Sequence, residues 1–341
     1  MPTFVLAPGY GISRLIKGGW HLAGGHGNID RGQALRDMAA FVEAGITTFD
    51  CADIYTGVEE LIGEFRAAYP TLARQVQIHT KFVPDLDRLA TLGAAEVEAI
   101  IDRSLRRLGV ETLDLVQFHW WDYALPRHVE IALELERLRR SGKIRHIGLT
   151  NFDLEHLRQI VEGGVPVVSH QVQYSLLDER PRGAMADYCL ARGIGLLCYG
   201  TVAGGFLSHA WLGRAAPVEL ANRSLTKYRL IIDEFGGWDM FQQLLERLQR
   251  VALRHGADIA SVATRMVLDR PAVAAAIVGA TSTAHLAQHR NIAALNLSAE
   301  DVREIADLCA RRRGPSGEVY ALERDREGPH GRIMKYTLNR D

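Results

Sequence analysis

The sequence predicts an α/β fold in which eight parallel strands, each followed by a helix, close into a (β/α)8 TIM barrel. Short apolar or β-branched runs alternate with helical stretches from residue 31 to about residue 293. Strands separated by helices pair in parallel, because a helical crossover returns the chain to the same edge of the sheet. A doubly wound open sheet is the main structural rival, yet Gly18-Gly19-Trp20 does not continue into the GxGxxG fingerprint of that fold.

Two short extended segments come before the barrel. Thr3–Leu6 and Tyr10–Ser13 flank Ala7-Pro8-Gly9, which is a turn signal, so we expect a hairpin that closes the barrel floor. The expected barrel strands are Arg14–Gly18, Ile46–Phe49, Gln75–Thr80, Leu113–Phe118, Ile144–Leu149, Val167–His170, Ile194–Cys198 and Ala274–Val278.

Amphipathic helices are expected between the strands. In residues 94–108, for example, Val97, Ile101 and Leu105 recur at helical spacing with charged residues between them. Gly109 directly after this stretch is suited to end the helix, because glycine adopts positive φ readily. The expected helices span residues 31–44, 57–69, 94–108, 126–141, 153–163, 178–192, 240–255, 258–268 and 299–313.

No linker divides the chain, so the sequence predicts a single domain over residues 1–341. Its barrel core covers about residues 14–295, and a C-terminal helix and tail loop cover residues 296–341. Two stretches, residues 200–238 and 314–341, lack barrel periodicity. Long irregular loops in a compact domain are usually functional or mobile.

Composition excludes several classes of protein. Apolar residues make up 47% of the chain and charged residues 24%, as in soluble globular proteins. A formal charge of −1 gives no reason to expect nucleic acid or a membrane surface as partner. The longest apolar run, Val273–Val278, is far shorter than the ~20 residues of a membrane helix. The four cysteines form no CxxC pair and the start of the chain does not resemble a signal peptide, so we expect a cytoplasmic protein with reduced thiols.

Four polar residues, Asp50, Tyr55, Lys81 and His119, each follow an expected strand. Taken singly, each is more often a turn cap, a solvated loop end or a satisfied edge residue. Because the active sites of such barrels lie at the carboxyl ends of the strands, three consecutive strand ends would bring the four together. Jointly, therefore, they favour a site.

These residue types suit proton transfer. The unperturbed pKa of tyrosine is about 10, so Tyr55 needs help. An ammonium at Lys81 would favour the phenolate, and Asp50 would keep that lysine protonated and oriented. His119 would polarise a carbonyl as a neutral hydrogen-bond donor. Such a set can protonate a carbonyl oxygen as hydride arrives at carbon, or run the reverse reaction on an alcohol.

The motifs around these residues resemble those of the aldo-keto reductase family. Phe49–Tyr55 is similar to the signature that carries the family's catalytic Asp and Tyr, and Lys81 occupies its lysine position. Leu105–Phe118, closing with His119, resembles the second signature, and Gly142–Phe152 resembles the third. The resemblance spans residues 14 to about 295. It implies an NAD(P)-dependent oxidoreductase that acts on carbonyls or alcohols without a metal, with Asp50, Tyr55, Lys81 and His119 as catalytic residues.

The resemblance also implies a cofactor site. Thr150, Asn151 and Gln171 would hold the nicotinamide carboxamide, and Tyr199 would stack on the ring. The turn from Gly200 to Leu207 would cover the pyrophosphate, although the family's usual Tyr-Ser-Pro-Leu pattern is absent there. The implied cofactor-binding residues are Gly18, Gly19, Trp20, Asp50, Thr150, Asn151, Gln171, Tyr199, Gly200, Thr201, Gly205, Leu207, Gly279, Thr281, Ser282 and Asn291.

The adenine end departs from the family pattern. A basic residue that pairs with the 2′-phosphate of NADP is common where this chain has Thr281, and Ala287 and Gln288 stand where an arginine is often found. Ser282 and the helix that begins there could still bind an anion. The expected cofactor is therefore NADP(H), with NAD(H) also accepted and discrimination between the two weakened. A compensating cation would come from Arg223, Lys227 or Arg290.

Aromatic residues near the strand ends suggest an apolar substrate pocket for a bulky or ring-shaped ketone. The expected pocket residues are Trp20, Phe82, Trp120, Trp238 and Tyr320. Trp121 and Trp211 are expected to pack the loops instead. His285 and His289 are spaced i, i+4 but have no third ligand nearby, so we expect a solvated helix face and no metal site.

The leading hypothesis is reversible reduction of an aldehyde or ketone to an alcohol, with Tyr55 as general acid and base and a small molecule as substrate. One alternative is a dehydrogenase that oxidises a hydroxylated metabolite such as a sugar or terpenoid alcohol. Another is a non-catalytic regulatory subunit that binds the cofactor. The sequence leaves substrate, direction, stereochemistry and oligomeric state open.

Overall fold

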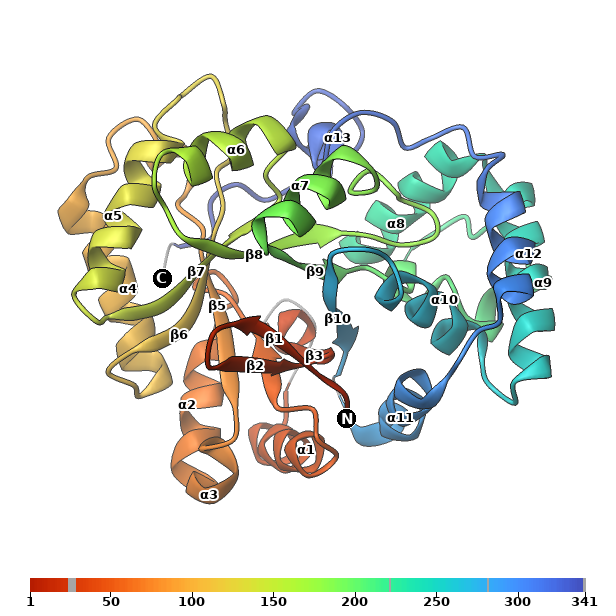
Figure 1. The fold of residues 1–341 in the computed structure, drawn as a ribbon, viewed down its shortest axis with the longest axis horizontal. Helices are drawn as coiled ribbons and strands as arrows, with labels where there is room; N and C mark the ends of the chain where they lie inside the picture. Colours follow the sequence, from red (N-terminus) through yellow and green to blue (C-terminus); the bar gives the residue numbers. More distant parts are fainter. Residues whose placement is uncertain (24–28, 221, 281, 340–341) are drawn as a thin grey trace.

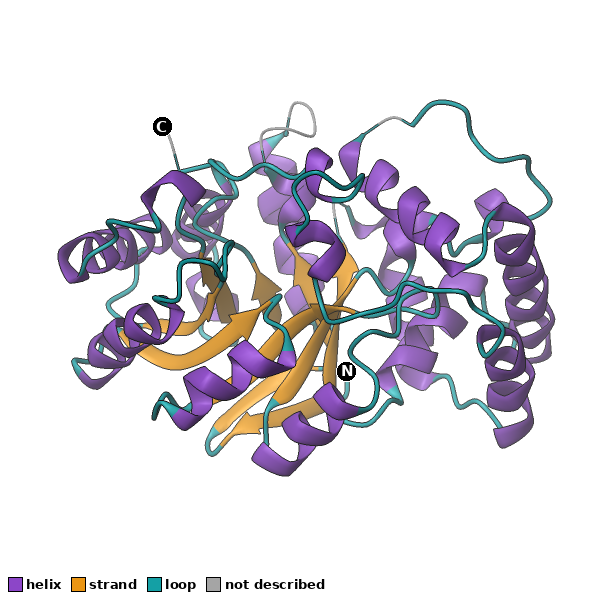
Figure 2. Cartoon of the chain, turned by 90° about the horizontal axis from the view of Figure 1, so that it is seen from above, coloured by secondary structure: helices purple, strands orange, loops and turns teal. Residues whose placement is uncertain are grey.

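A computed structural model describes residues 1–23, 29–220, 222–280 and 282–339, and it confirms the predicted barrel. Eight parallel strands pair in the closed order β10-β3-β4-β5-β6-β7-β8-β9. The strands lie inside a surround of helices (Figure 2). The barrel strands are β3 (Leu15–Gly18), β4 (Thr48–Asp50), β5 (Gln77–Phe82), β6 (Leu113–Phe118), β7 (Ile144–Thr150), β8 (Val167–Gln173), β9 (Gly195–Tyr199) and β10 (Val273–Gly279).

The helices of the described residues follow the predicted alternation. Several ends agree closely with the sequence pattern, and the predicted helix over residues 94–108 has the same bounds in the structure. The helices are α1 (Arg31–Glu43), α2 (Val58–Ala68), α3 (Pro70–Ala73), α4 (Ala94–Leu108), α5 (His128–Arg140), α6 (Leu154–Glu162), α7 (Ala184–Arg192), α8 (Arg223–Phe235), α9 (Trp238–Arg254), α10 (Ile259–Leu268), α11 (Leu286–Ala294), α12 (Ala299–Cys309) and α13 (Ala321–Arg324).

The structure departs most from the prediction in two stretches. The helix predicted over residues 178–192 begins only at Ala184, because Asp178 and Arg180 form a buried ion pair of 2.7 Å and Gly183 has φ 78°. The segment 200–238, predicted to lack regular structure, contains α8. Tyr228, Ile231 and Phe235 recur at helical spacing and could have indicated this helix. Asn222 caps it, because the Asn222 side chain accepts a hydrogen bond from the Leu225 backbone N–H.

The predicted hairpin is present and covers one end of the barrel. Strands β1 (Thr3–Ala7) and β2 (Tyr10–Ser13) pair antiparallel and lie across the barrel in Figure 1. Tyr10 is 3% exposed, and its hydroxyl lies 3.1 Å from Nε2 of His79, a residue of β5. We call this end the floor, and the end where the strands have their carboxyl termini the mouth.

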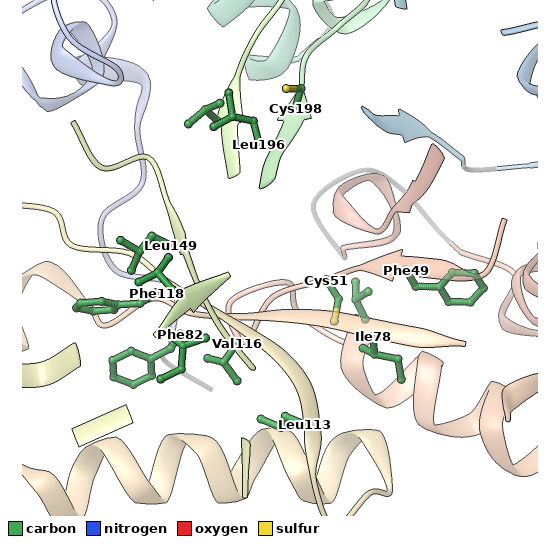
Figure 3. Packing of buried hydrophobic residues seen from close by; sticks show 14 of the residues in the cluster. Phe49, Cys51, Ile78, Phe82, Leu113, Val116, Phe118, Leu149, Leu196 and Cys198 are labelled. Carbon is green, nitrogen blue, oxygen red and sulfur yellow. The ribbon is translucent and has the colours of Figure 1, made fainter. Parts of the chain in front are cut away.

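Side-chain alternation along β5 and β6 decides what faces the barrel interior. Lys81 faces inward and contacts Asp50, so its neighbour Phe82 faces the helices. Phe82 packs against Phe118 of β6 with ring centroids 5.8 Å apart, and Figure 3 shows both beside Leu149. The apolar core between strands and helices therefore fixes which side chains project into the barrel.

Two further expectations concern the whole chain. None of the helices in the described ranges combines the length and the hydrophobicity needed to cross a lipid bilayer. The cysteines are buried and form no disulfide bond, as their spacing predicted: Cys51, Cys189, Cys198 and Cys309.

Candidate active site

A buried ion pair lies at the mouth of the barrel. Lys81, near the end of β5, places Nζ 2.7 Å from Oδ2 of Asp50 at the end of β4, and also donates to the Cys51 carbonyl at 2.8 Å. Burial alone would lower the pKa of Lys81, but attraction to Asp50 and Tyr55 raises that pKa above its ordinary value. The lysine is therefore a permanent cation at neutral pH.

Two glutamines hold the other oxygen of the carboxylate. Asp50 Oδ1 accepts hydrogen bonds from Gln117 Nε2 at 3.1 Å and Gln171 Nε2 at 2.6 Å. Gln171 Nε2 also donates to Gln117 Oε1 at 2.8 Å. The sequence analysis missed Gln117, although a polar residue inside the apolar run of β6 was an available signal. Together the glutamines fix the orientation of Asp50.

Tyr55 lies directly beside this pair, in the loop after β4. Lys81 Nζ is 4.8 Å from the centroid of the Tyr55 ring, and the Trp20 ring meets it edge-on at 5.0 Å. Burial raises the pKa of Tyr55 by more than the Lys81 charge lowers it. We expected the lysine to lower this pKa, whereas the net shift is upward. Tyr55 is consequently a neutral phenol that can donate a proton.

His119 follows β6 and completes the group of four. Its Nδ1 lies 3.1 Å from the Thr150 carbonyl oxygen, and because a carbonyl can only accept, Nδ1 carries the proton. Burial, and then the positive charge of Arg324, lower the pKa of His119 to about 3. The neutral ring therefore presents an unprotonated Nε2, which has no hydrogen-bond partner among the described residues. This corrects the expectation that His119 donates to a carbonyl.

The C-terminal tail closes over this group. Arg324 of α13 donates to the carbonyls of Trp121 at 2.9 Å and Asn151 at 2.8 Å, and to the Tyr123 hydroxyl at 2.7 Å. Glu323 pairs with Arg180 at 3.1 Å, so both α13 residues are tied to the barrel. The sequence of residues 314–341 has no helical or strand periodicity that would have predicted these contacts. They form between residues far apart in the sequence.

A cavity of about 700 Å³ extends from the group of four, within the usual size range of ligand pockets. Trp20 and Tyr320 line it as expected, and so does Trp121, which we had assigned to loop packing. Tyr320 meets His119 with ring centroids 5.5 Å apart. Residues Ile333, Met334, Lys335 and Leu338 of the tail also line the cavity.

Three expected pocket residues do not line this cavity. Phe82 faces the helices because it alternates with Lys81, and Trp120 is fully buried with its indole N–H bonded to the Asp122 and Leu125 carbonyls at 2.9 Å. Trp238 begins α9 and packs against Trp211 at 5.8 Å between ring centroids. The prediction that these three form the pocket was wrong, because it ignored which face of each element they occupy.

Most residues expected at the cofactor site border the same cavity: Gly18, Trp20, Asp50, Thr150, Asn151, Gln171, Tyr199, Gly200, Thr201, Gly205, Leu207 and Gly279. Gly19, Ser282 and Asn291 do not border it. Gly19 packs against β4, where an added Cβ would lie 2.7 Å from the Asp50 carbonyl oxygen. Ser282 caps a short helix by accepting from Ala284 N, and Asn291 lies within α11. Thr281 lies outside the described residues.

The two histidines that we placed on a solvated face also border the cavity. His289 is 4% exposed and packs against Phe41, and burial, followed by the neighbouring His285, lowers the pKa of His289 to about 4. Within the described ranges, no cluster of His, Cys, Asp and Glu side chains has the composition of a metal site.

The cavity has features that fit a nicotinamide dinucleotide. The Gln171 amide N–H bonds are directed to Asp50 and Gln117, which leaves its carbonyl oxygen for an incoming donor. Tyr199 Oη donates to Asn151 Oδ1 at 2.9 Å, which leaves the Asn151 amide nitrogen for an incoming acceptor. A Cβ at Gly200 would lie 2.5 Å from the Tyr228 hydroxyl, so only glycine lets this turn pack on α8. The exposed backbone of such a turn suits a pyrophosphate.

Comparison with known proteins finds one matching family model and several similar proteins. A family model described as "Aldo/keto reductase family" matches residues 14–310. The chain is 29% identical over 299 residues to flagellar radial spoke protein 5 of Chlamydomonas reinhardtii, covering 70% of this chain and only 56% of that protein. It is 25% identical over 334 residues to the NADH-specific methylglyoxal reductase of Escherichia coli (strain K12), covering 88% and 96% of the two chains. The structure of a glycerol dehydrogenase from Gluconobacter oxydans superimposes with a TM-score of 0.77 at 25% identity, covering 92% of this chain and 97% of that one.

Proposed function

The chain belongs to the aldo/keto reductase family, and we propose that it reduces an aldehyde or ketone reversibly to an alcohol with a nicotinamide cofactor. One observation carries the proposal. The buried Asp50–Lys81 pair lies against Tyr55, and these side chains border the cavity at the mouth of the barrel together with His119. A neutral phenol next to a permanent cation is arranged to give up a proton and to stabilise the resulting phenolate.

In the proposed reaction, Tyr55, Lys81 and Asp50 have separate roles. Tyr55 donates its proton to the carbonyl oxygen of the substrate, and Lys81 stabilises the phenolate by its charge. Asp50, held by Gln117 and Gln171, keeps Lys81 protonated and in place. When bound, the reduced nicotinamide would supply the hydride. General acid catalysis of this kind contributes about 10²–10⁴-fold in rate.

The cofactor would be held by residues that border the cavity. Gln171 and Asn151 offer an acceptor and a donor for the carboxamide, and Tyr199 offers a ring face. The Gly200–Leu207 turn would face the pyrophosphate. The segment from Gly279 through α11 would take the adenosine end, where we retain Ser282 and Asn291 as outer contacts.

We further propose that NADH is accepted as well as NADPH. The described residues between Gly279 and Ile292 that border the cavity include no lysine or arginine. Of the three cations expected to compensate, Arg223 and Lys227 border the cavity and Arg290 does not, and Lys335 of the tail borders it as well. Lys227 Nζ lies 3.7 Å from Glu323 Oε1, and this carboxylate balances the positive charge of Lys227. The relative from Escherichia coli is named NADH-specific.

Measuring kcat/KM with each cofactor tests this preference. A preference for NADPH above about a thousandfold, or ~4 kcal/mol, would refute it. Arg223→Gln is the matched variant, because loss of a strong NADPH preference in it would identify Arg223 as the 2′-phosphate partner.

The proposed reaction is tested by following cofactor oxidation across a panel of aldehydes, ketones and dicarbonyls. Wild type should turn over at least one of them, and Tyr55→Phe should lose about 10²-fold or more in kcat. Tyr69→Phe, at the end of α2 and away from the cavity, is the matched control and should keep full activity. An equal rate in Tyr55→Phe and wild type would contradict the assigned role.

Two alternatives have specific support. The same residues would oxidise an alcohol in the reverse direction, and one similar structure is named a glycerol dehydrogenase. Another relative is named a flagellar radial spoke protein, a name that states no reaction. Cofactor binding without turnover across the whole panel, in both directions, would favour the non-catalytic alternative. The unpaired, buried cysteines fit the cytoplasmic location that we propose.

A further inference from the structure

One lysine lies among three tyrosine rings on the cavity wall. Lys227 of α8 places its ammonium 5.1 Å from the ring centroid of Tyr199 and 5.6 Å from that of Tyr320. The ring of the neighbouring Tyr228 lies 6.0 Å from the same ammonium. Because the lysine and all three tyrosines border the cavity, the positive charge lies at the cavity wall.

This part of the wall is close to the place where the carbonyl would be reduced. The Tyr320 ring meets the His119 ring with centroids 5.5 Å apart. Tyr199 is the residue expected to stack on the nicotinamide, which would supply the hydride. Because Lys227 approaches both tyrosine rings, its charge lies near the reacting part of the substrate.

Among the described residues, Lys227 has an ion-pair partner but no hydrogen-bond acceptor. Its Nζ lies 3.7 Å from Glu323 Oε1, which is too long for a hydrogen bond. The two oxygens of Glu323 instead accept hydrogen bonds from Arg180 at 3.1 and 3.3 Å. The N–H groups of Lys227 can therefore still donate to a ligand in the cavity.

The ion pairs around Lys227 form a network of two cations and two carboxylates: Lys227, Arg180, Asp178 and Glu323. Arg324 adds a further cation, because its guanidinium carbon lies 5.5 Å from the centroid of the Tyr320 ring. The described partners of Arg324 are carbonyl oxygens and the Tyr123 hydroxyl, none of which carries a negative charge. One positive charge in this group is therefore in excess, and one incoming carboxylate would make the group neutral.

The cavity wall also favours an anion. Over the described residues, its charged side chains are the Asp50–Lys81 pair and three further cations: Arg223, Lys227 and Lys335. Apart from the paired Asp50, no carboxylate in that part of the chain borders the cavity. An anionic substrate would therefore meet no opposing charge on the wall.

We propose that Lys227 binds a carboxylate on the substrate, so that the preferred substrates are oxo acids, which are aldehydes or ketones with a carboxylate away from the carbonyl. The carboxylate would accept charge-assisted hydrogen bonds from the ammonium while its carbon chain packs against the tyrosine rings. Reduction leaves the carboxylate unchanged and gives a hydroxy acid. This proposal rests on the proposed carbonyl reduction and names its substrate class.

Matched pairs of an acid and its methyl ester test the role of the charge. Succinic semialdehyde and para-carboxybenzaldehyde carry the carboxylate at different distances from the aldehyde, and each ester keeps the carbon skeleton without the charge. In wild type we expect kcat/KM for at least one acid to exceed that of its ester by about tenfold or more. Equal values within both pairs, or faster reaction of both esters, would overturn the role of Lys227.

Substitutions show whether Lys227 carries the preference. Lys227→Met should bring the acid-to-ester ratio of kcat/KM close to one by slowing the acid, whereas Lys227→Arg should keep a preference for the acid. Both members of a pair use the same cofactor, so any effect of Lys227 on cofactor affinity cancels in the ratio. A full acid preference in Lys227→Met would contradict the proposal.

Two other lysines serve as controls. Lys335→Met removes an exposed cation that borders the same cavity, and it should keep the wild-type ratio. Lys143→Met is the matched control, because Lys143 pairs with Glu98 at 2.8 Å and does not border the cavity. Loss of the acid preference in Lys335→Met but not in Lys227→Met would overturn the assignment to Lys227.

The outcomes distinguish this inference from the function beneath it. Turnover of acids and esters at equal kcat/KM would overturn the substrate class and leave carbonyl reduction intact. No turnover of any carbonyl with either cofactor would overturn carbonyl reduction, and the substrate class with it. The comparison in wild type needs no variant, so it decides the substrate class even where Lys227→Met does not fold.

Discussion

His79 and His119 are both buried histidines of this barrel, but they lie at opposite ends of it. At the floor, His79 Nε2 meets the Tyr10 hydroxyl at 3.1 Å, and a hydroxyl can donate or accept, so either tautomer fits. At the mouth, His119 Nδ1 meets a carbonyl that accepts only. Burial lowers the pKa of each ring to about 3, yet only His119 borders the cavity. Burial therefore neutralises both rings, and what distinguishes His119 is its carbonyl partner and its place on the cavity.

The rest of each end differs in the same way. The floor surrounds Tyr10 with apolar side chains such as Ile12, Leu115 and Leu197. The mouth instead buries the charges of Asp50 and Lys81, which are expensive to remove from water. A barrel needs the first arrangement for stability and has no structural need of the second. The proposed reaction accounts for the ion pair.

The largest effect should come from breaking that pair. Lys81→Met leaves Asp50 buried without its cation, so we expect about 3–5 kcal/mol of destabilisation and loss of nearly all activity. Asp50→Asn combined with Lys81→Met should recover much of the stability and none of the activity. Chemical denaturation and kcat measured on the same samples check both statements. Recovery of activity in the double variant would show that the charges serve only structure.

A smaller effect is expected where the tail is fastened to the mouth. Arg324→Ala removes hydrogen bonds to the Trp121 and Asn151 carbonyls and a charge near His119, so we expect kcat/KM to fall about tenfold, mainly through KM. Arg326→Ala is the matched control, because this exposed side chain only approaches Asp122 at 3.6 Å. Equal effects of the two substitutions would contradict a specific role for Arg324.

The strand ends could be predicted from sequence because period and turn signals are local. Asp50, Lys81 and His119 each follow a short apolar run, and the barrel topology then requires them to meet. Phe82 was misplaced for an equally simple reason. It neighbours Lys81 in β5, so the two side chains face opposite sides of the sheet.

The tail could not be predicted by such rules. Arg324 and Glu323 gain their roles from partners more than a hundred residues away, and nothing in residues 314–341 repeats with the period of a helix or strand. The orientation of the His119 ring could not be predicted from the sequence either. It depends on the backbone carbonyl of Thr150, an atom that every residue type provides.

The pH dependence of stability should reveal the neutral histidines. The ordinary pKa of histidine is about 6.5, and burial lowers the pKa of His79 to about 3 in the folded protein, so the unfolded state binds more protons between these values. Its contribution to stability is complete above pH 6.5 and is lost as the pH falls toward 3. The substitution His79→Gln removes this contribution. It should reduce the slope of the unfolding free energy against pH by up to about 1.4 kcal/mol per pH unit below pH 6. An unchanged slope would mean that the ring is charged in the fold.

The smallest effect is expected at the floor hydroxyl. Tyr10→Phe removes one hydrogen bond to His79 and leaves the ring contacts with His146, so about 1 kcal/mol of stability should be lost. Activity should stay at the wild-type value, in contrast to Tyr55→Phe. Thermal unfolding and initial rates measure the two quantities. A large loss of activity in Tyr10→Phe would remove the distinction between floor and mouth.

Hydride transfer itself is the most direct test of the mouth as a reaction centre. Reduced cofactors carrying deuterium at the transferable ring position would be incubated with the wild-type protein and a mixture of carbonyl compounds, and the alcohols analysed by mass spectrometry. We predict one deuterium on the carbon that was the carbonyl carbon, formed by wild type and reduced about 10²-fold or more in Tyr55→Phe. Cofactor binding with no deuterated alcohol from any carbonyl would contradict the proposal that this barrel is a carbonyl reductase.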